Sequence, residues 1–472
     1  MAGRFLNLFK PLARFIPEVK APERRVSFNE KLFWTAIALI IYLVMASDAC
    51  RLYGIQREEE FAPLRIIFAS SRGTLMELGI GPIVTAGLIL QLLVGSAMIE
   101  CDMSKPEDRA LFTTASKVLA IILTGVQASA YIISGMYGQL LGATAVIVFL
   151  QLLAAGIIVM LLDELIQKGW GFGSGISLFI MAGVAQQIFM ECFNPSPPVD
   201  EYGSAGILVA LVQTILSGKP VTGLLLRRNF PSLIGLIATI AAFLIIIYME
   251  GVRVELPLSY AGYRGFRSRY PIKLLYVSNL PVIFASALFA NIYFFSYLLW
   301  YNFSRPQGGN FWTDLLGWYK LEENQYVPAG GLVYYVTSPG NLSNVITEPL
   351  RAFGYLTILV VFCVIFSLTW LEVGGLGPST VAKQLVNAGM QIPGYRRSGK
   401  AVEQILKRYI PAVTVLGGII VGLIAGLSDF FGVFGSGVGI LLSVGIIYQY
   451  YEILVRERVA EMYPAFRKIF GG

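Results

Sequence analysis

Residues 233–248 read LIGLIATIAAFLIIIY and contain no charged side chain. A helix needs about 20 apolar residues to cross the hydrocarbon core of a bilayer, and this run reaches that length together with its flanks. Comparable apolar runs recur at residues 33–46, 145–162, 283–300, 355–371, 413–427 and 438–447. The pattern predicts an all-α membrane protein that crosses the bilayer many times.

The composition supports this class and excludes several kinds of chemistry. The chain is 56% hydrophobic and 14% charged, whereas soluble domains carry about 25% charged residues. It has no histidine, which removes histidine bases, histidine metal ligands and Ser-His or Cys-His nucleophiles. The four cysteines are scattered without a CxxC pair, so we expect no disulfide framework, no zinc site and no cofactor. The polar, basic first 32 residues are unlike a cleavable signal peptide.

The spacing of the apolar runs predicts ten spans. These spans are residues 32–50, 73–98, 112–134, 143–163, 174–193, 231–250, 278–301, 350–372, 409–428 and 434–455. Most of the 36 Lys and Arg residues fall in segments on the side of the N-terminus, so the positive-inside rule places both termini in the cytoplasm. We divide the chain into an N-tail (1–31), a first half (32–193), a second half (231–455) with cytoplasmic loops at 251–277 and 373–408, and a C-tail (456–472).

A short internal repeat relates the two halves. The second span reads GPIVTAGLI from Gly81, and the seventh reads LPVIFASAL from Leu280. Each run continues to an amide side chain, Gln91 or Asn291. The two spans are five apart, and an odd offset gives them opposite orientations. This predicts two inverted five-helix halves, an arrangement in which function lies where the repeats meet.

Several motifs favour a structural interpretation over a chemical one. The glycine-rich run at 169–175 lacks a Walker lysine and a preceding strand, so we predict a tight turn and not a nucleotide site. Asp163 and Glu164 are paired carboxylates, which we interpret as a solvated helix end and not as an acid–base pair. Glycines at 418, 422 and 426 share a helix face and predict close helix packing.

Two outer segments lie between the spans. The apolar segment at 203–217 is too short to cross and is expected along the outer surface. The longer loop at 303–344 is assigned no role, and a β-hairpin is expected at 331–337, where VYYV is β-prone.

Two predicted cytoplasmic loops are longer and more basic than a simple connection requires. One contains YRGFRSRYPIK within residues 253–273, and the other, at 391–408, reads QIPGYRRSGKAVEQILKR. Their charge has two interpretations that remain open from the pattern alone: orientation of the chain with attraction to anionic lipid, or a docking surface for an acidic partner such as RNA.

These segments together resemble the pore subunit of the SecY protein-conducting channel, in its archaeal and eukaryotic branches. The resemblance covers nearly the whole chain. It is carried by RGTLMELGIGPIVTAGLILQLL (72–93), LLDELIQKGWGFGSGISLFI (161–180), YPIKLLYVSNLPVIFASALFAN (270–291), LKRYIP (406–411) and the N-tail FIPEVKAPERRV (15–26).

The resemblance implies ten helices around an hourglass pore that opens axially to water and sideways to lipid. Its narrowest point is implied to be an aliphatic ring formed by Ile80, Val84, Ile176, Ile180, Ile283 and Leu442. A short plug that seals the ring from outside is implied at 61–72. Its residues include Phe61, Leu64, Arg65, Ile66, Ile67, Phe68 and Arg72.

The resemblance also implies a lateral gate between the second and seventh spans, with polar positions at Thr85, Gln91, Gln127 and Asn291. Arg264 and Arg396 correspond to ribosome-contacting tips of the two basic loops. The implied partners are the ribosome, a nascent polypeptide with its signal sequence, the small SecE/gamma and beta membrane subunits, and membrane lipids. The implied location is the archaeal plasma membrane or the endoplasmic reticulum.

Two other classes of protein compete with a passive channel. A secondary solute transporter also uses inverted repeats, but it would concentrate polar residues in mid-membrane, whereas the predicted constriction is aliphatic. An intramembrane enzyme is disfavoured by the missing histidine and by the lack of carboxylate pairs within the spans.

Overall fold

The computed structural model describes residues 11, 16–55, 73–95, 98–99, 101, 106–133, 137, 142–197, 200–227, 230–260, 267–275, 280–303, 311–322, 325–387, 390–391 and 399–462, and structural statements concern these residues. The predicted plug at 61–72 lies outside them, as do Arg264 and Arg396.

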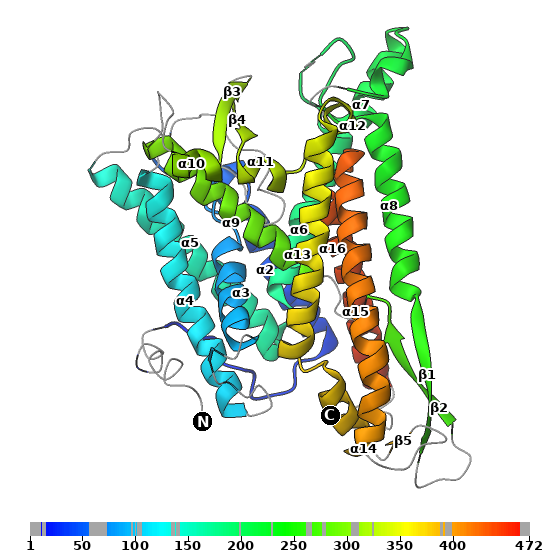
Figure 1. The fold of residues 1–472 in the computed structure, drawn as a ribbon. Coiled ribbons are helices and arrows are strands. Elements are labelled where there is room, and N and C mark those ends of the chain that lie inside the picture. The colour runs from blue at the N-terminus through cyan, green and yellow to red at the C-terminus, as the bar shows by residue number, and fades with distance from the viewer. Residues whose placement is uncertain are drawn as a thin grey trace.

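The fold is a bundle of long helices with small elements at both ends (Figure 1). The long helices are α2 (Phe28–Met45), α4 (Pro106–Ile133), α5 (Ala143–Leu165), α6 (Gly175–Phe193), α8 (Leu233–Gly251), α9 (Leu280–Phe303), α13 (Pro349–Val373), α15 (Gly399–Phe430) and α16 (Gly437–Met462). The shorter helix α3 (Gly81–Gly95) lies among them. The short helices are α7 (Ile207–Leu216), α10 (Phe311–Leu316), α11 (Leu332–Val336), α12 (Leu342–Thr347) and α14 (Pro378–Asn387), with single turns η2 (Asp48–Cys50), η3 (Ile166–Trp170) and η4 (Val221–Leu224).

The strands form two small sheets. At one end of the molecule, which we name the hairpin end, β1 (Arg253–Tyr260) pairs antiparallel with β2 (Arg267–Lys273) and with β5 (Met390–Gln391). At the opposite end, which we name the outer end, β3 (Trp318–Glu322) pairs with β4 (Gln325–Gly330).

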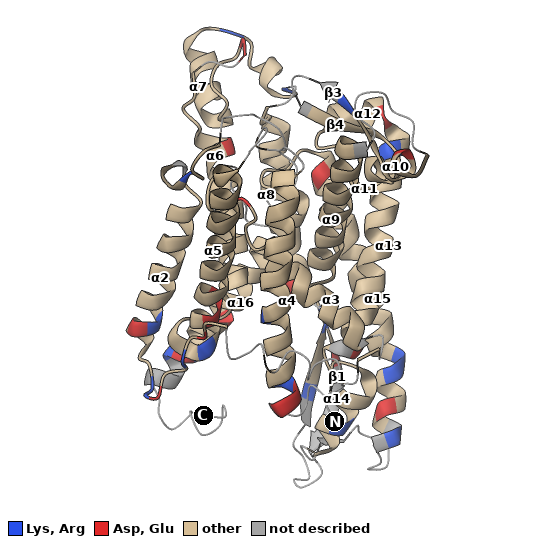
Figure 2. Cartoon of the chain, turned by 90° about the vertical axis from the view of Figure 1, so that its left-hand side faces the viewer, with Lys and Arg blue, Asp and Glu red and all other residues tan. Residues whose placement is uncertain are grey.

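The prediction of a polytopic helical membrane protein is confirmed. Nine helices among the described residues are long and apolar enough to span a bilayer. Their outward faces are apolar: on α8, for example, Ile237 is 64% exposed and Leu244 63% exposed. Charged residues gather near the ends of the helices and are sparse along their middles (Figure 2).

The second predicted span, 73–98, is shorter than expected. Its first eight residues form consecutive turns, and the helix α3 begins only at Gly81. Gly79 has a φ of +54°, a left-handed conformation that ends regular helix and suits glycine. Pro82 then occupies the first helical turn, where its missing N–H costs nothing.

The two ends of the described helical bundle lie on one side. Lys31 Nζ, in the second turn of α2, pairs with Glu457 Oε1 near the end of α16 at 2.7 Å. Because the two residues are in contact, they lie on the same side of the membrane, and the chain between them must cross it an even number of times. This agrees with the prediction that both termini share one side of the membrane.

The glycine face of α15 packs closely on α13, as predicted. A Cβ on Gly418 would lie 2.7 Å from Ser367 Oγ, and one on Gly422 would lie 2.9 Å from Val360 Cα. Real Cβ atoms do not approach so closely, so these positions require glycine for the two helices to meet.

The predicted hairpin at 331–337 is wrong. Residues 332–336 form the short helix α11, and the hairpin of this loop is the preceding pair β3 and β4. Val333 and Val336 are both buried. Their i, i+3 spacing places them on one helical face, so burial on the neighbouring spans outweighs the β-propensity of VYYV.

Candidate functional site

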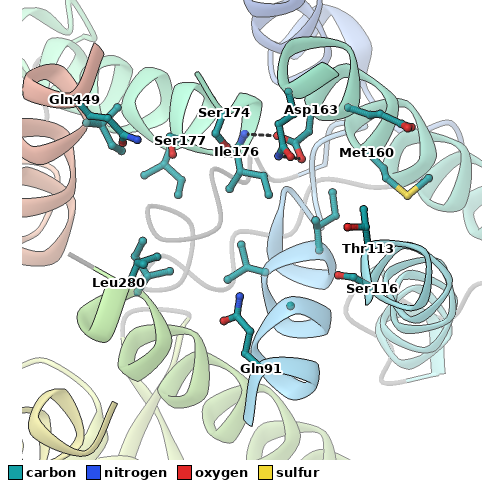
Figure 3. Close-up of a pocket in the computed structure, with 18 of the residues that line it drawn as sticks. Gln91, Thr113, Ser116, Met160, Asp163, Ser174, Ile176, Ser177, Leu280 and Gln449 are labelled. Carbon is teal, nitrogen blue, oxygen red and sulfur yellow. Dashed lines mark hydrogen bonds between the residues drawn. The ribbon is translucent and has the colours of Figure 1, made fainter. Parts of the chain in front are cut away.

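A cavity of about 1000 Å³ opens between seven of the spans at the hairpin end. Figure 3 shows how its lining converges: Gln91 comes from α3, Thr113 and Ser116 from α4, Ile176 and Ser177 from α6, Leu280 from α9 and Gln449 from α16. The spans of both predicted halves therefore line one shared cavity.

The structure brings the six predicted ring residues together. Val84, Ile176, Ile180, Ile283 and Leu442 line the cavity. Ile80, Ile180 and Leu442 belong to the largest buried apolar cluster, and the other three pack against it. Ile80 is 0% exposed and Leu442 is 1% exposed. We name these six aliphatic residues, which line the cavity or are buried with its lining, the floor of the cavity.

The rim of the cavity carries charges of both signs. Glu164 Oε1 pairs with Lys117 Nζ at 2.6 Å and with Lys168 Nζ at 2.8 Å. Lys168 Nζ also pairs with Glu18 Oε1 at 2.5 Å. This hydrogen bond from Lys168 is the largest of the effects that hold the pKa of Glu18 below its ordinary value.

The interpretation of Asp163 and Glu164 as a solvated helix end is wrong. Asp163 is 8% exposed and Glu164 is 7% exposed. Burial of a carboxylate is tolerated only when it is paired or hydrogen-bonded. Glu164 is paired with Lys117, and Asp163 accepts a hydrogen bond from the N–H of Ile176. Both partners are distant in the sequence.

The predicted gate positions are only partly in contact. Asn291 Nδ2 on α9 donates to Thr85 Oγ1 on α3 at 3.2 Å and to the carbonyl of Ala287 at 2.8 Å. Gln91 lines the cavity, and its Oε1 is buried without a hydrogen-bond partner. Gln127 lies half-buried on α4 and is not among the residues that line the cavity.

The two basic loops meet at the hairpin end. β5 leads into the second loop and pairs with β1 of the first, with Ser259 opposite Gln391 and Tyr260 opposite Met390. Arg264 and Arg396 follow these paired positions by a few residues in the sequence. Strands from the two loops therefore belong to one sheet.

Sequence reasoning missed the N-tail as part of the site. Lys168 Nζ donates to the carbonyl of Val19 at 2.5 Å, and Trp170 Nε1 donates to the carbonyl of Lys20 at 2.8 Å. These bonds hold residues 18–20 at the rim of the cavity. The tail's family-like sequence was visible, but it gave no sign of which residues it would touch.

Sequence reasoning also missed the role of Glu77. Its carboxylate is 7% exposed and accepts a hydrogen bond from the N–H of Gly73, four residues earlier. The turns that precede α3 are therefore closed by a buried side chain. The signal present in the sequence is a charged side chain near the start of an otherwise apolar span.

These features define the class as a polytopic helical membrane protein whose spans enclose a cavity with a charged rim and an aliphatic floor. The family follows from comparison with known proteins. The sequence profile of the SecY family matches residues 74–451, and this chain belongs to that family.

Similar proteins extend over almost the whole chain. The protein translocase subunit SecY of Pyrococcus furiosus is 42% identical, over 98% of this chain and 99% of the relative. A solved structure described as "The structure of a protein conducting channel" is 41% identical with a TM-score of 0.81, covering 97% of this chain and 98% of the other. "Sec61 in the Canine ribosome-channel complex from the endoplasmic reticulum" is 40% identical with a TM-score of 0.79, at the same coverage.

Proposed function

We propose that this chain is the central pore subunit of a passive protein-conducting channel, which passes unfolded polypeptides across the membrane and releases transmembrane segments sideways into lipid. The observation that carries the proposal is the aliphatic floor of the cavity, formed by side chains from both halves of the chain. Aliphatic constrictions close by excluding water and deform around a passing chain. Membership of the SecY family supports the same function.

The competing solute-transporter function is not supported. A transporter places its polar substrate and ion sites near mid-membrane. In this cavity the charged residues Glu18, Lys117 and Lys168 stand at the rim, and the floor is aliphatic. The near-full-length relatives are channels or translocase subunits by name.

Under this proposal each predicted site has a defined task. The ring Ile80, Val84, Ile176, Ile180, Ile283 and Leu442 forms the constriction, and residues 61–72 seal it from the outer end. The helices α3 and α9 separate to admit an apolar signal sequence. Arg264 and Arg396 contact the ribosome, a partner named for the canine relative, and the small SecE/gamma and beta subunits complete the channel in the membrane.

The proposal is tested by photo-crosslinking. A ribosome-bound nascent chain is arrested in the channel, and a photoreactive amino acid replaces Ile283 in the ring. A second probe replaces Leu244, which is 63% exposed on the outward face of α8, as a matched control. We expect labelling of the nascent chain from 283 and none from 244. Absence of labelling from position 283 in an intact complex would favour the transporter function over the channel function.

A further inference from the structure

A sequence repeat marks the starts of α6 and α16. Residues 172–177 read FGSGIS and residues 434–439 read FGSGVG. In both copies the phenylalanine is buried, Phe172 at 2% and Phe434 at 1% exposure. The glycine that follows has nearly the same left-handed φ in both copies, +69° at Gly173 and +70° at Gly435.

Each copy is held by a threonine from a helix far away in sequence. The N–H of Phe172 donates to Thr35 Oγ1 on α2 at 3.0 Å, and the N–H of Phe434 donates to Thr239 Oγ1 on α8 at 2.9 Å. Both threonine hydroxyls donate in turn to the carbonyl four residues earlier in their own helix. The two contacts use the same donor group and the same acceptor atom.

Each copy is also held by a buried aspartate at the end of the preceding helix. Asp163 Oδ1 accepts from the N–H of Ile176 at 2.9 Å, and Asp429 Oδ1 accepts from the N–H of Gly437 at 2.6 Å. The second oxygen of each carboxylate is also satisfied, by Gln167 Nε2 or by the hydroxyl of Tyr355, both at 2.7 Å. The first N–H groups of a helix lack intrahelical partners, so each aspartate caps the helix that follows it.

A glycine at the first position of each helix makes this approach possible. A Cβ on Gly175 would lie 2.6 Å from Asp163 Cα, and a Cβ on Gly437 would collide with the carbonyl oxygen of Ala425. Neither position can hold a larger residue without moving the helix start away from its aspartate.

The two copies also contact each other's helix. Gly173 packs against the ring of Tyr450 on α16, and Gly435 packs against Val184 and Ile188 on α6, with a Cβ at either glycine placed 3.1 Å from those side chains. Tyr450 donates its hydroxyl to the carbonyl of Ser174 at 2.9 Å. The helices α6 and α16 are thus held to one another near both copies of the turn.

We propose that Asp163 and Asp429 are positioning residues of the channel, which fix α6 and α16 as the stationary wall of the constriction and thereby maintain its resting seal. This inference rests on the proposed pore function. The helix α6 carries Ile176 and Ile180, and α16 carries Leu442. Each aspartate therefore acts on the ring through the backbone of the helix it caps.

The opposite wall lacks an equivalent contact among the described residues. The helices α3 and α9 are joined across the gate by a 3.2 Å hydrogen bond between the side chains of Asn291 and Thr85. Opening by displacement of α3 and α9, while α6 and α16 stay in place, is the movement that this difference favours.

The test measures resting ion conductance of the reconstituted channel complex in planar bilayers, together with thermal stability. Asp163→Ala and Asp429→Ala remove the cap, and each is expected to raise resting conductance about fivefold, the effect of losing one typical helix cap. Asp163→Asn and Asp429→Asn keep an acceptor oxygen and are expected to stay within about twofold of the unmodified channel, because asparagine caps as well as aspartate.

The matched control is Asp200→Ala. Asp200 pairs with the buried Arg227 at 2.7 Å but caps neither α6 nor α16. This variant should lose thermal stability and keep its resting conductance. Resting conductance of Asp163→Ala and Asp429→Ala equal to that of Asp200→Ala would overturn the proposal.

Two further measurements keep the result decisive. If the alanine variants do not assemble, Asp163→Glu and Asp429→Glu replace them. Glutamate retains the charge but displaces the acceptor oxygens by one methylene. A raised resting conductance in these variants supports the proposal, and an unchanged resting conductance overturns it. The photo-crosslink from position 283, on α9, tests the pore function separately. A positive crosslink with unchanged conductance in the aspartate variants rejects only the positioning role.

Discussion

Asn291 Nδ2 on α9 lies 3.2 Å from Thr85 Oγ1 on α3 and donates a hydrogen bond to it. The two residues are 206 positions apart in the sequence, and they lie in the two spans that the short repeat relates. This bond crosses the seam at which the proposed channel opens sideways. Its strength therefore bears on how readily a signal sequence separates the two helices.

Thr85→Val should make the gate easier to open. Valine keeps the shape of threonine and removes the hydroxyl, while Asn291 retains its bond to the carbonyl of Ala287. Hydrogen bonds between membrane helices contribute about 0.6 kcal/mol on average, so the open fraction should rise about threefold. Translocation of a reporter with a weakly apolar signal sequence measures the change. Thr357→Val, at an exposed threonine of α13, is the control, and an equal response of both variants would contradict the prediction.

Gln91→Leu should act in the opposite direction. The Oε1 of Gln91 is buried at the same seam without a hydrogen-bond partner, and a buried unsatisfied polar group costs about 1–3 kcal/mol. Leucine removes this penalty and packs against Leu88, Leu92 and Phe284 around a small neighbouring cavity. We expect the gate to stay closed for weak signal sequences and to open for strongly apolar ones. Easier translocation of the weak signal would show that Gln91 is not strained in the closed gate.

The spans were predictable because burial in lipid demands long apolar runs, and those runs are local in the sequence. The ring residues and gate positions followed from resemblance. The structure places five of the six ring residues, and Gln91 of the gate, in the lining of one cavity. The errors have a common physical origin. Asp163 and Glu164 were misread because Lys117 and Ile176, which satisfy them, become neighbours only in the fold. The helix at 332–336 was misread because tertiary burial of Val333 and Val336 overrides local propensity.

Replacing residues 61–72 by a Gly-Ser segment of equal length should make the resting channel leak ions. The segment corresponds by resemblance to the plug, and the replacement keeps the chain connection while it removes every apolar side chain that would seal the aliphatic floor. Single-channel recordings in planar bilayers without a translocating chain give the measurement. Conductance as low as that of the unmodified channel would remove the plug assignment.

Charge reversal at the basic loops should weaken ribosome binding. Arg264→Glu and Arg396→Glu replace a cation that attracts ribosomal RNA phosphates by an anion that repels them. Each should lower affinity by about tenfold or more at low salt, with a smaller effect at high salt because salt screens the interaction. Co-sedimentation of ribosomes with proteoliposomes measures binding. Lys320→Glu, on β3 at the outer end, should leave affinity unchanged, and unchanged affinity in the two loop variants as well would remove the docking assignment.

Acid should release the N-tail from the cavity rim. The bond from Lys168 holds the pKa of Glu18 below its ordinary value of 4.5, so the contact contributes stability above that value and loses it as pH falls through the lower, folded-state pKa. The effect is small because the Glu18 side chain is 64% exposed.

Fluorescence anisotropy measures the release. A fluorophore is attached at Lys20→Cys, in a chain without its native cysteines. Its anisotropy should be constant from pH 7 to about 5 and fall below about 4.5. In Glu18→Gln the anisotropy should already be low at pH 7 and should not change as the pH falls. In the control Glu23→Gln, at an exposed position of the same tail, the anisotropy should still fall in a step below about pH 4.5. A step that persists in Glu18→Gln would assign the titration to another carboxylate of the rim.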